Sequence, residues 1–181
     1  GFSGAATTET LGALTPTAGA ATVRLVGNGA AANLTFTSLG ATTAASSLNF
    51  DTSSASGGSI TLTGQAVTTG TTLPGSGGAQ GHIYINGADF ATINGSAQVV
   101  APTYSGAGNF QNASTTLAAA VHNKLTGSFT NAAATVSSLV TNSQTLSLSG
   151  NLTVSTGGIL QSGGTASILS NDATSRLIVA G

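Results

Sequence analysis

The sequence predicts an all-β fold, because short alternating stretches recur along it and residues that favour helices are scarce. In these stretches apolar side chains alternate with small polar ones, which is typical of half-buried strands. Thr, Ser, Gly and Asn are abundant, whereas Glu, Lys and Arg are rare and Met is absent. The stretch most similar to a helix is 114–121, and we expect a strand there as well.

The predicted strands are four to five residues long and are separated by glycine-rich turns. The clearest strands are 22–26, 33–37, 47–51, 59–63, 82–86, 145–149, 151–155 and 176–179. The turns are 27–29, 56–58, 75–78, 157–158 and 163–164. This spacing fits a β-solenoid with coils of roughly 20–25 residues, and it also fits a pilin- or adhesin-like β-sandwich.

Composition favours the solenoid over the sandwich. Alanine and glycine are frequent, as expected where successive coils stack about 4.8 Å apart. Ser, Thr and Asn recur at outward positions, where like groups can form ladders along the stack. Large aromatic residues, which usually fill a sandwich core, are scarce, with 6 Phe, 2 Tyr and no Trp. We therefore expect residues 1–181 to form a single β-rich domain or a segment of a longer repeat protein.

Two stretches resemble a known family of repeats. Residues 146–164 (LSLSGNLTVSTGGILQSGG) and 59–73 (SITLTGQAVTTGTTL) both contain an alternating strand, a turn with Ser or Thr and Gly, and a second strand. This pattern resembles the passenger-associated β-strand repeats of autotransporter-like bacterial surface proteins. The resemblance implies a right-handed β-helix within a large secreted or surface-attached protein, and it supplies no catalytic residues. Residues 98–131 depart from the pattern.

The near absence of charge excludes some partners and predicts others. Charged residues make up 4% of the chain, against about 25% in ordinary soluble domains. Three basic residues cannot form the patch that nucleic acid or an anionic membrane requires. No apolar run approaches the ~18 residues of a membrane span.

The same scarcity leaves strand edges unguarded, because charges and prolines normally block edge pairing. We therefore predict an extracellular or bacterial cell-surface structural protein, a building block of a fibre, filament or sheath assembled through β-edge and apolar contacts. Its partners would be further copies of itself, as a homopolymer, or adjoining repeats of the same chain. The absence of Cys and Met, the most oxidisable residues, agrees with an exposed location.

The alternative is an adhesin passenger domain that binds carbohydrate or a host surface. On the predicted strand at 82–86, His82, Tyr84 and Asn86 share one face, while Ile83 and Ile85 face the core. His82, Tyr84 and Asn86 are therefore the candidate contact residues.

Conventional enzyme chemistry is not expected. Cleavage of a glycosidic bond uses two acids about 5–9.5 Å apart, and only a chance stacking of coils would bring Asp51 and Asp89 together. His82 and His122 lie far apart, and the chain has no cysteine, so we predict no metal and no other cofactor. Lys124 is the only lysine, which limits isopeptide cross-linking to one bond.

Overall fold

The computed structural model describes residues 4–27, 29–41, 46–65, 72–73, 82–155 and 158–180. These residues form an all-β fold without a helix, which confirms the all-β part of the predicted fold class. None of them forms a helix that is long and apolar enough to cross a membrane. The predicted turn at 75–78 lies outside the described residues.

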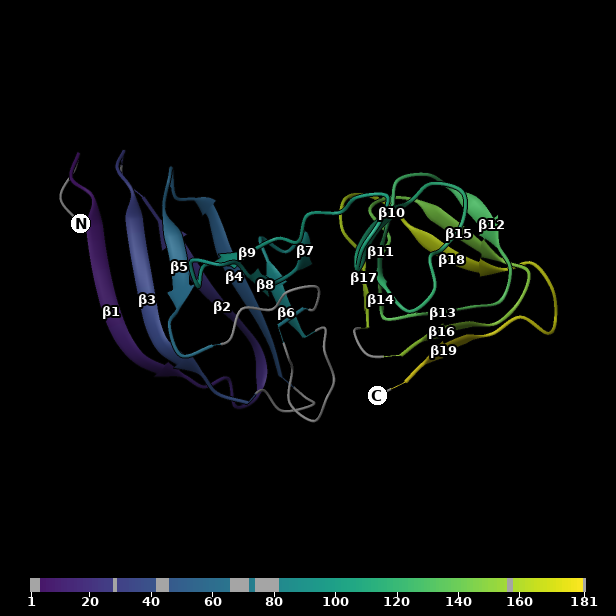
Figure 1. The fold of residues 1–181 in the computed structure, drawn as a ribbon, viewed down its shortest axis with the longest axis horizontal. Helices are drawn as coiled ribbons and strands as arrows, with labels where there is room; N and C mark the ends of the chain where they lie inside the picture. Colours follow the sequence, from purple (N-terminus) through teal and green to yellow (C-terminus); the bar gives the residue numbers. More distant parts are fainter. Residues whose placement is uncertain are drawn as a thin grey trace.

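The N-terminal half contains two parallel sheets in which each strand pairs with the second strand after it (Figure 1). One sheet has the order β1 (Thr7–Leu14), β3 (Ala32–Leu39) and β5 (Ser59–Leu62). The other begins β2 (Gly19–Val26), β4 (Ser46–Ser54) and β6 (Ile83–Ile85), and ends with β7 (Asp89–Phe90), which is antiparallel to β6. An antiparallel pair, β8 (Thr92–Ile93) and β9 (Val99–Val100), closes this half.

In the C-terminal half, each strand from β11 to β16 pairs in parallel with the third strand after it. The first sheet is β10 (Phe110–Ala113), β11 (His122–Leu125), β14 (Ser138–Val140) and β17 (Ile159–Leu160). The second is β12 (Phe129–Asn131), β15 (Thr145–Leu148) and β18 (Ser167–Ser170). The third is β13 (Ala134–Val136), β16 (Leu152–Val154) and β19 (Leu177–Val179).

Each half has its own hydrophobic core, built from the inward residues of alternating strands. In the N-terminal half, Leu48 and Phe50 on β4 are fully buried against Ile60 and Leu62 on β5. The core of the C-terminal half has the same construction and is lined mainly by leucine and valine. Its fully buried members are Leu125, Val136, Leu139, Leu146, Leu152 and Val154. Alternation of buried and exposed residues is the pattern from which the strands were predicted.

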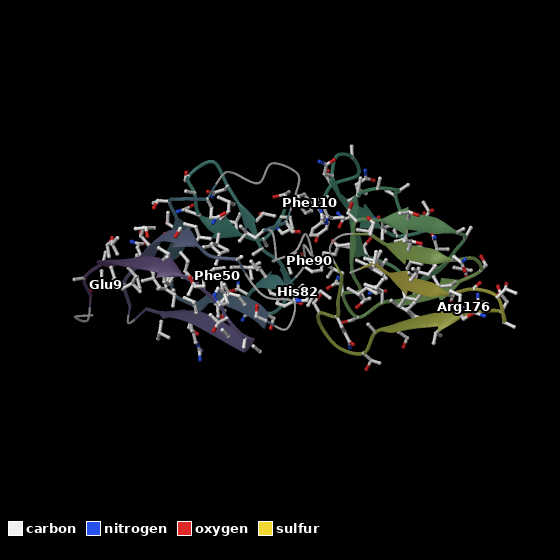
Figure 2. All side chains as sticks on the ribbon, turned by 90° about the horizontal axis from the view of Figure 1, so that it is seen from below. Glu9, Phe50, His82, Phe90, Phe110 and Arg176 are labelled. Carbon is white, nitrogen blue, oxygen red and sulfur yellow. The ribbon has the colours of Figure 1, made fainter. Side chains whose placement is uncertain are left out.

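The sheets of the two halves extend in different directions. Figure 1 shows β1 and β3 following one another along the long axis of the molecule, whereas β13, β16 and β19 follow one another across it. Among the described residues, no strand of β1–β9 pairs with a strand of β10–β19. Figure 2 shows Phe90 and Phe110 at the junction between the halves, with Glu9 and Arg176 near opposite ends. The halves are therefore joined by the connecting segment 101–109 and by side-chain contacts rather than by a shared sheet.

The predicted strand at 114–121 is wrong, because this stretch forms bends and turns. Two buried asparagines satisfy part of its backbone, while the backbone groups of Thr135 and Ser137 bind Ala120 and Val121. Asn131 accepts a hydrogen bond from the Leu117 N–H at 2.9 Å, and Asn123 accepts one from the Ala118 N–H at 3.0 Å. Asn123 also donates to the Ala118 carbonyl at 2.9 Å. Buried backbone groups need partners, and here side chains supply some of them.

Candidate functional site

The structure places the predicted contact residues on or beside β6, but they face different neighbours. Ile83 and Ile85 are buried in the core, and His82 and Tyr84 are half-buried. The Tyr84 ring packs against Phe90, with ring centroids 5.9 Å apart, so it is turned towards the junction. Burial there raises the pKa of the Tyr84 phenol.

Asn86 leaves β6 through a left-handed backbone conformation (φ 56°), in which asparagine is tolerated better than most residues. Its side-chain oxygen accepts a hydrogen bond from the Thr52 N–H at 2.8 Å. The Asn86 side chain lines a hollow of about 450 Å³, together with Asn33 and Gln98. The hollow is therefore rich in side-chain amides, with Ile85 among its apolar lining residues.

The chain's only lysine takes part in a compact group at the junction, here called the junction cluster: Asp89, Tyr104 and Lys124. Lys124 Nζ lies 2.8 Å from Asp89 Oδ2, and the Tyr104 hydroxyl donates to Asp89 Oδ1 at 2.7 Å. Asp89 is only 4% exposed. The Phe90 N–H also donates to Oδ1, at 2.9 Å. Both carboxylate oxygens are thus held by donors away from bulk water.

Aromatic rings surround the junction cluster. The lysine ammonium lies 5.3 Å from the centroid of the Tyr104 ring, which favours a cation there. The Tyr104 ring meets Phe110 edge to face, with centroids 5.7 Å apart. Burial, and then the charge of Asp89, raise the pKa of Tyr104 above that of an ordinary phenol. Tyr104 therefore stays protonated and remains a hydrogen-bond donor.

A buried histidine, His122, continues the row of rings that begins with Tyr104 and Phe110. The His122 ring stacks on Phe110, with centroids 4.7 Å apart and an interplanar angle of 18°. Its Nδ1 lies 2.7 Å from the Ser138 hydroxyl on the neighbouring strand. Burial lowers the pKa of His122 to about 4, because the charged imidazolium would lose its hydration. His122 is therefore neutral near pH 7.

Local sequence explains how the junction cluster forms, although sequence reasoning did not find it. Asn86 and Gly87 adopt positive φ and reverse the chain, so that Asp89 returns beside Ile85 on the antiparallel strand β7. Lys124 lies on β11 beside Asn112 of β10. Asp89 and Lys124 are 35 positions apart, and no local pattern links them. The available signal was the gathering of Tyr84, Phe90, Tyr104 and Phe110 in a chain with few aromatics.

The two aspartates considered for catalysis have separate partners. Asp51 lies 3.3 Å from the Arg24 guanidinium, and hydrogen bonds from the Ser53 side chain and backbone, with the Arg24 charge, lower its pKa. Asp89 belongs to the junction cluster. Within the described ranges, no three His, Asp or Glu side chains gather in a way that could hold a metal ion.

A third feature is the set of edge strands that lie nearest to a chain end in the five larger sheets, here called the open edges: β1 and β2 in the N-terminal half, and β17, β18 and β19 in the C-terminal half. The opposite edges of the same sheets are β5, β7, β10, β12 and β13. Every large hydrophobic residue that is exposed among the described residues lies on one of these strands. They are Leu11, Val26, Leu169, Leu177, Ile178 and Val179. The most exposed is Val26, at 65%, followed by Val179, at 53%.

No protein-family model matches the chain, and neither the curated proteins nor the solved structures contain a significant match to it. The indications of function therefore lie in the geometry of the open edges, the amide-lined hollow and the junction cluster.

Proposed function

We propose that the chain winds as a β-solenoid, with two strands per turn in the N-terminal half and three per turn in the C-terminal half. Parallel pairing of every second or every third strand supports this proposal, because a solenoid places corresponding strands of successive coils side by side. Hydrogen bonds between neighbouring coils span 26 positions from Asn33 to Ser59 and 18 positions from Ser149 to Asn131. A β-sandwich would instead be built from antiparallel sheets.

We further propose that the protein is an extracellular structural building block whose open edges pair with a second copy of the chain. The observation that carries this proposal is the restriction of exposed large hydrophobic residues to the edge strands. An edge strand presents backbone donors and acceptors in a row, and apolar side chains beside that row favour its burial. The resemblance to autotransporter-like repeats is consistent with a location at a bacterial surface.

The chemistry of the edges favours a copy of the same chain over a charged partner. Strands β17, β18 and β19 carry no charged residue, and the Arg24 side chain of β2 is already paired with Asp51. Glu9 is the one charged residue on β1. Contacts made by backbone hydrogen bonds and apolar side chains depend little on ionic strength, because salt screens charges. Association should therefore persist in concentrated salt.

Sedimentation velocity tests this proposal in dilute buffer and in about 1 M salt. We expect concentration-dependent association under both conditions. Replacing Leu177 and Val179 by lysine should abolish it, since two buried like charges would face the incoming strand. The matched control places lysine at Ser147 on β15 and Thr153 on β16, because both strands already have a neighbour on each side. A monodisperse monomer in both buffers would refute self-assembly.

The amide-lined hollow favours a second candidate function, which is carbohydrate binding. Amide groups both donate and accept hydrogen bonds, and so match the hydroxyl groups of a neutral sugar. Asn86 lines the hollow and was one of the predicted contact residues. A glycan array should then show saturable binding that is lost in Asn86→Gly, which keeps the left-handed backbone without strain. Asn142→Gly removes an amide from another left-handed position (φ 46°) and is the control.

A further inference from the structure

The junction cluster is more than an ordinary ion pair, because its parts are placed for a condensation. We propose that Lys124 and Asp89 form an intramolecular isopeptide bond, which joins the two halves of the molecule covalently. This inference is independent of the proposed function. It rests on the 2.8 Å approach of Lys124 Nζ to Asp89 Oδ2 and on the burial of the carboxylate.

The reaction is balanced without any co-reactant. The Lys124 ammonium first gives a proton to Asp89 Oδ2, leaving a neutral amine beside a neutral carboxylic acid. The nitrogen lone pair then attacks Cγ, and the resulting tetrahedral centre carries its negative charge on Oδ1. Collapse of this centre completes the Nζ–Cγ amide and breaks the Cγ–Oδ2 bond. Oδ2 leaves as water with two protons that originally belonged to the ammonium.

Two donors are positioned for the charge that develops on Oδ1. The Tyr104 hydroxyl lies 2.7 Å from this oxygen, and the Phe90 N–H lies 2.9 Å from it. Fixed donors aimed at a developing oxyanion stabilise the tetrahedral centre more than mobile water does. Because burial and the Asp89 charge raise the pKa of Tyr104, its hydroxyl keeps the proton that it donates.

Burial also favours the product over the ion pair. The buried Asp89 carboxylate and the Lys124 ammonium, whose side chain is 25% exposed, both lose hydration in the ion pair, whereas the amide carries no charge. The folded chain holds the two groups together, and such intramolecular arrangements reach effective concentrations of about 10⁵–10⁸ M. The environment contains Phe90, which is fully buried, and the ring of Tyr104. Water, which would reverse the reaction, has little access to the Asp89 side chain, which is 6% exposed.

The chain offers a simple experiment, because it has only three Lys and Arg residues and therefore three tryptic sites, after Arg24, Lys124 and Arg176. An amide at Lys124 blocks cleavage there. We expect the intact protein to be one water lighter than its sequence. Trypsin should release residues 25–176 of the denatured chain as one internally linked peptide. The proposal would be overturned if the intact protein had the full sequence mass and trypsin released separate peptides 25–124 and 125–176. It would also be overturned if the protein had lost one water but trypsin still cleaved after Lys124.

Variants separate the cross-link from a general effect of folding. Asp89→Ala should restore the full sequence mass and cleavage after Lys124. Tyr104→Phe should lower the linked fraction at a fixed time after synthesis, because it removes one donor to Oδ1. The matched control is Arg24→Lys, which places a lysine beside Asp51. The side chains of Arg24 and Asp51 are 58% and 20% exposed, so this pair is more open to water than Lys124 and Asp89. A bond at that site, or an unchanged linked fraction in Tyr104→Phe, would contradict the role assigned to burial and to the phenol.

Discussion

The buried, neutral His122 makes the stability of the protein depend on pH in a defined window. In the unfolded chain a histidine has a pKa near 6.5, whereas burial lowers the folded value to about 4. The unfolded state therefore binds more protons between these two values, so unfolding becomes easier as the pH falls. The stabilisation is complete above pH ~6.5, is lost progressively on acidification, and is gone below pH ~4.

The size of the effect follows from the two pKa values. From about pH 7 to about pH 5, protonation of the unfolded chain should lower the free energy of unfolding by about 2 kcal/mol. The window is unusually free of other titrating groups, because the chain has 4 acidic residues and 2 histidines. The lowered pKa values of Asp51 and Asp172 keep these carboxylates ionised in the folded protein across it. The stability that these two ionised carboxylates contribute is lost only at lower pH.

Urea unfolding measured at both pH values tests this reasoning. The wild-type midpoint should fall on acidification, whereas His122→Phe, which keeps a ring stacked on Phe110, should lose most of the pH dependence. His82→Phe is the matched control and should retain it. Equal midpoints for the wild type at the two pH values would refute a buried neutral imidazole, as would an unchanged pH dependence in His122→Phe.

Two further pairs of substitutions compare interior and exposed positions. Leu148→Ala should lower the free energy of unfolding by about 3 kcal/mol, because Leu148 is 1% exposed in the C-terminal core. Leu177→Ala, on an open edge, should change the free energy of unfolding by less than about 0.5 kcal/mol. Similar urea midpoints for these two variants would contradict the assigned core. Gly58→Ala should destabilise the protein by about 1–3 kcal/mol, because the new Cβ would overlap the Ala32 carbonyl oxygen. Gly12→Ala should be nearly neutral, because a Cβ at that position would have no other atom within 4 Å. Thermal melts that rank Gly12→Ala below Gly58→Ala would show that the packing of Gly58, just before β5, against Ala32 of β3 is wrong.

The sequence was most informative where a strand has one buried face. The stretch 47–51 alternates visibly, and it lies in β4 with Leu48 and Phe50 in the core. Strand β1 was not predicted, because most of its residues are exposed and its side chains alternate weakly. Its conformation follows from parallel pairing with β3, in the register Thr7 to Ala32. Pairing between distant segments is a tertiary effect that local patterns do not encode.

The sites were harder to predict than the strands for the same reason. The stretch 82–86 was correctly assigned as a strand with Ile83 and Ile85 inward. The neighbours of its outward residues depend on segments far along the chain: Tyr84 meets Phe90 after a chain reversal, and Asn86 meets Thr52. The strand predicted at 114–121 is wrong for the same reason, because this stretch is held by two residues outside it: Asn123, which is completely buried, and Asn131.

The different directions of the two sets of sheets have a consequence for any polymer of this protein. Strands added to β1 or β2 continue the stack along the long axis of the molecule, whereas strands added to β19 continue it across that axis (Figure 1). A polymer that used both ends would therefore bend inside every subunit, at the junction between the halves. Its outline would be a zigzag or a coil with a periodic corner. The stiffness of that corner would depend on the contacts of one lysine and the rings around it.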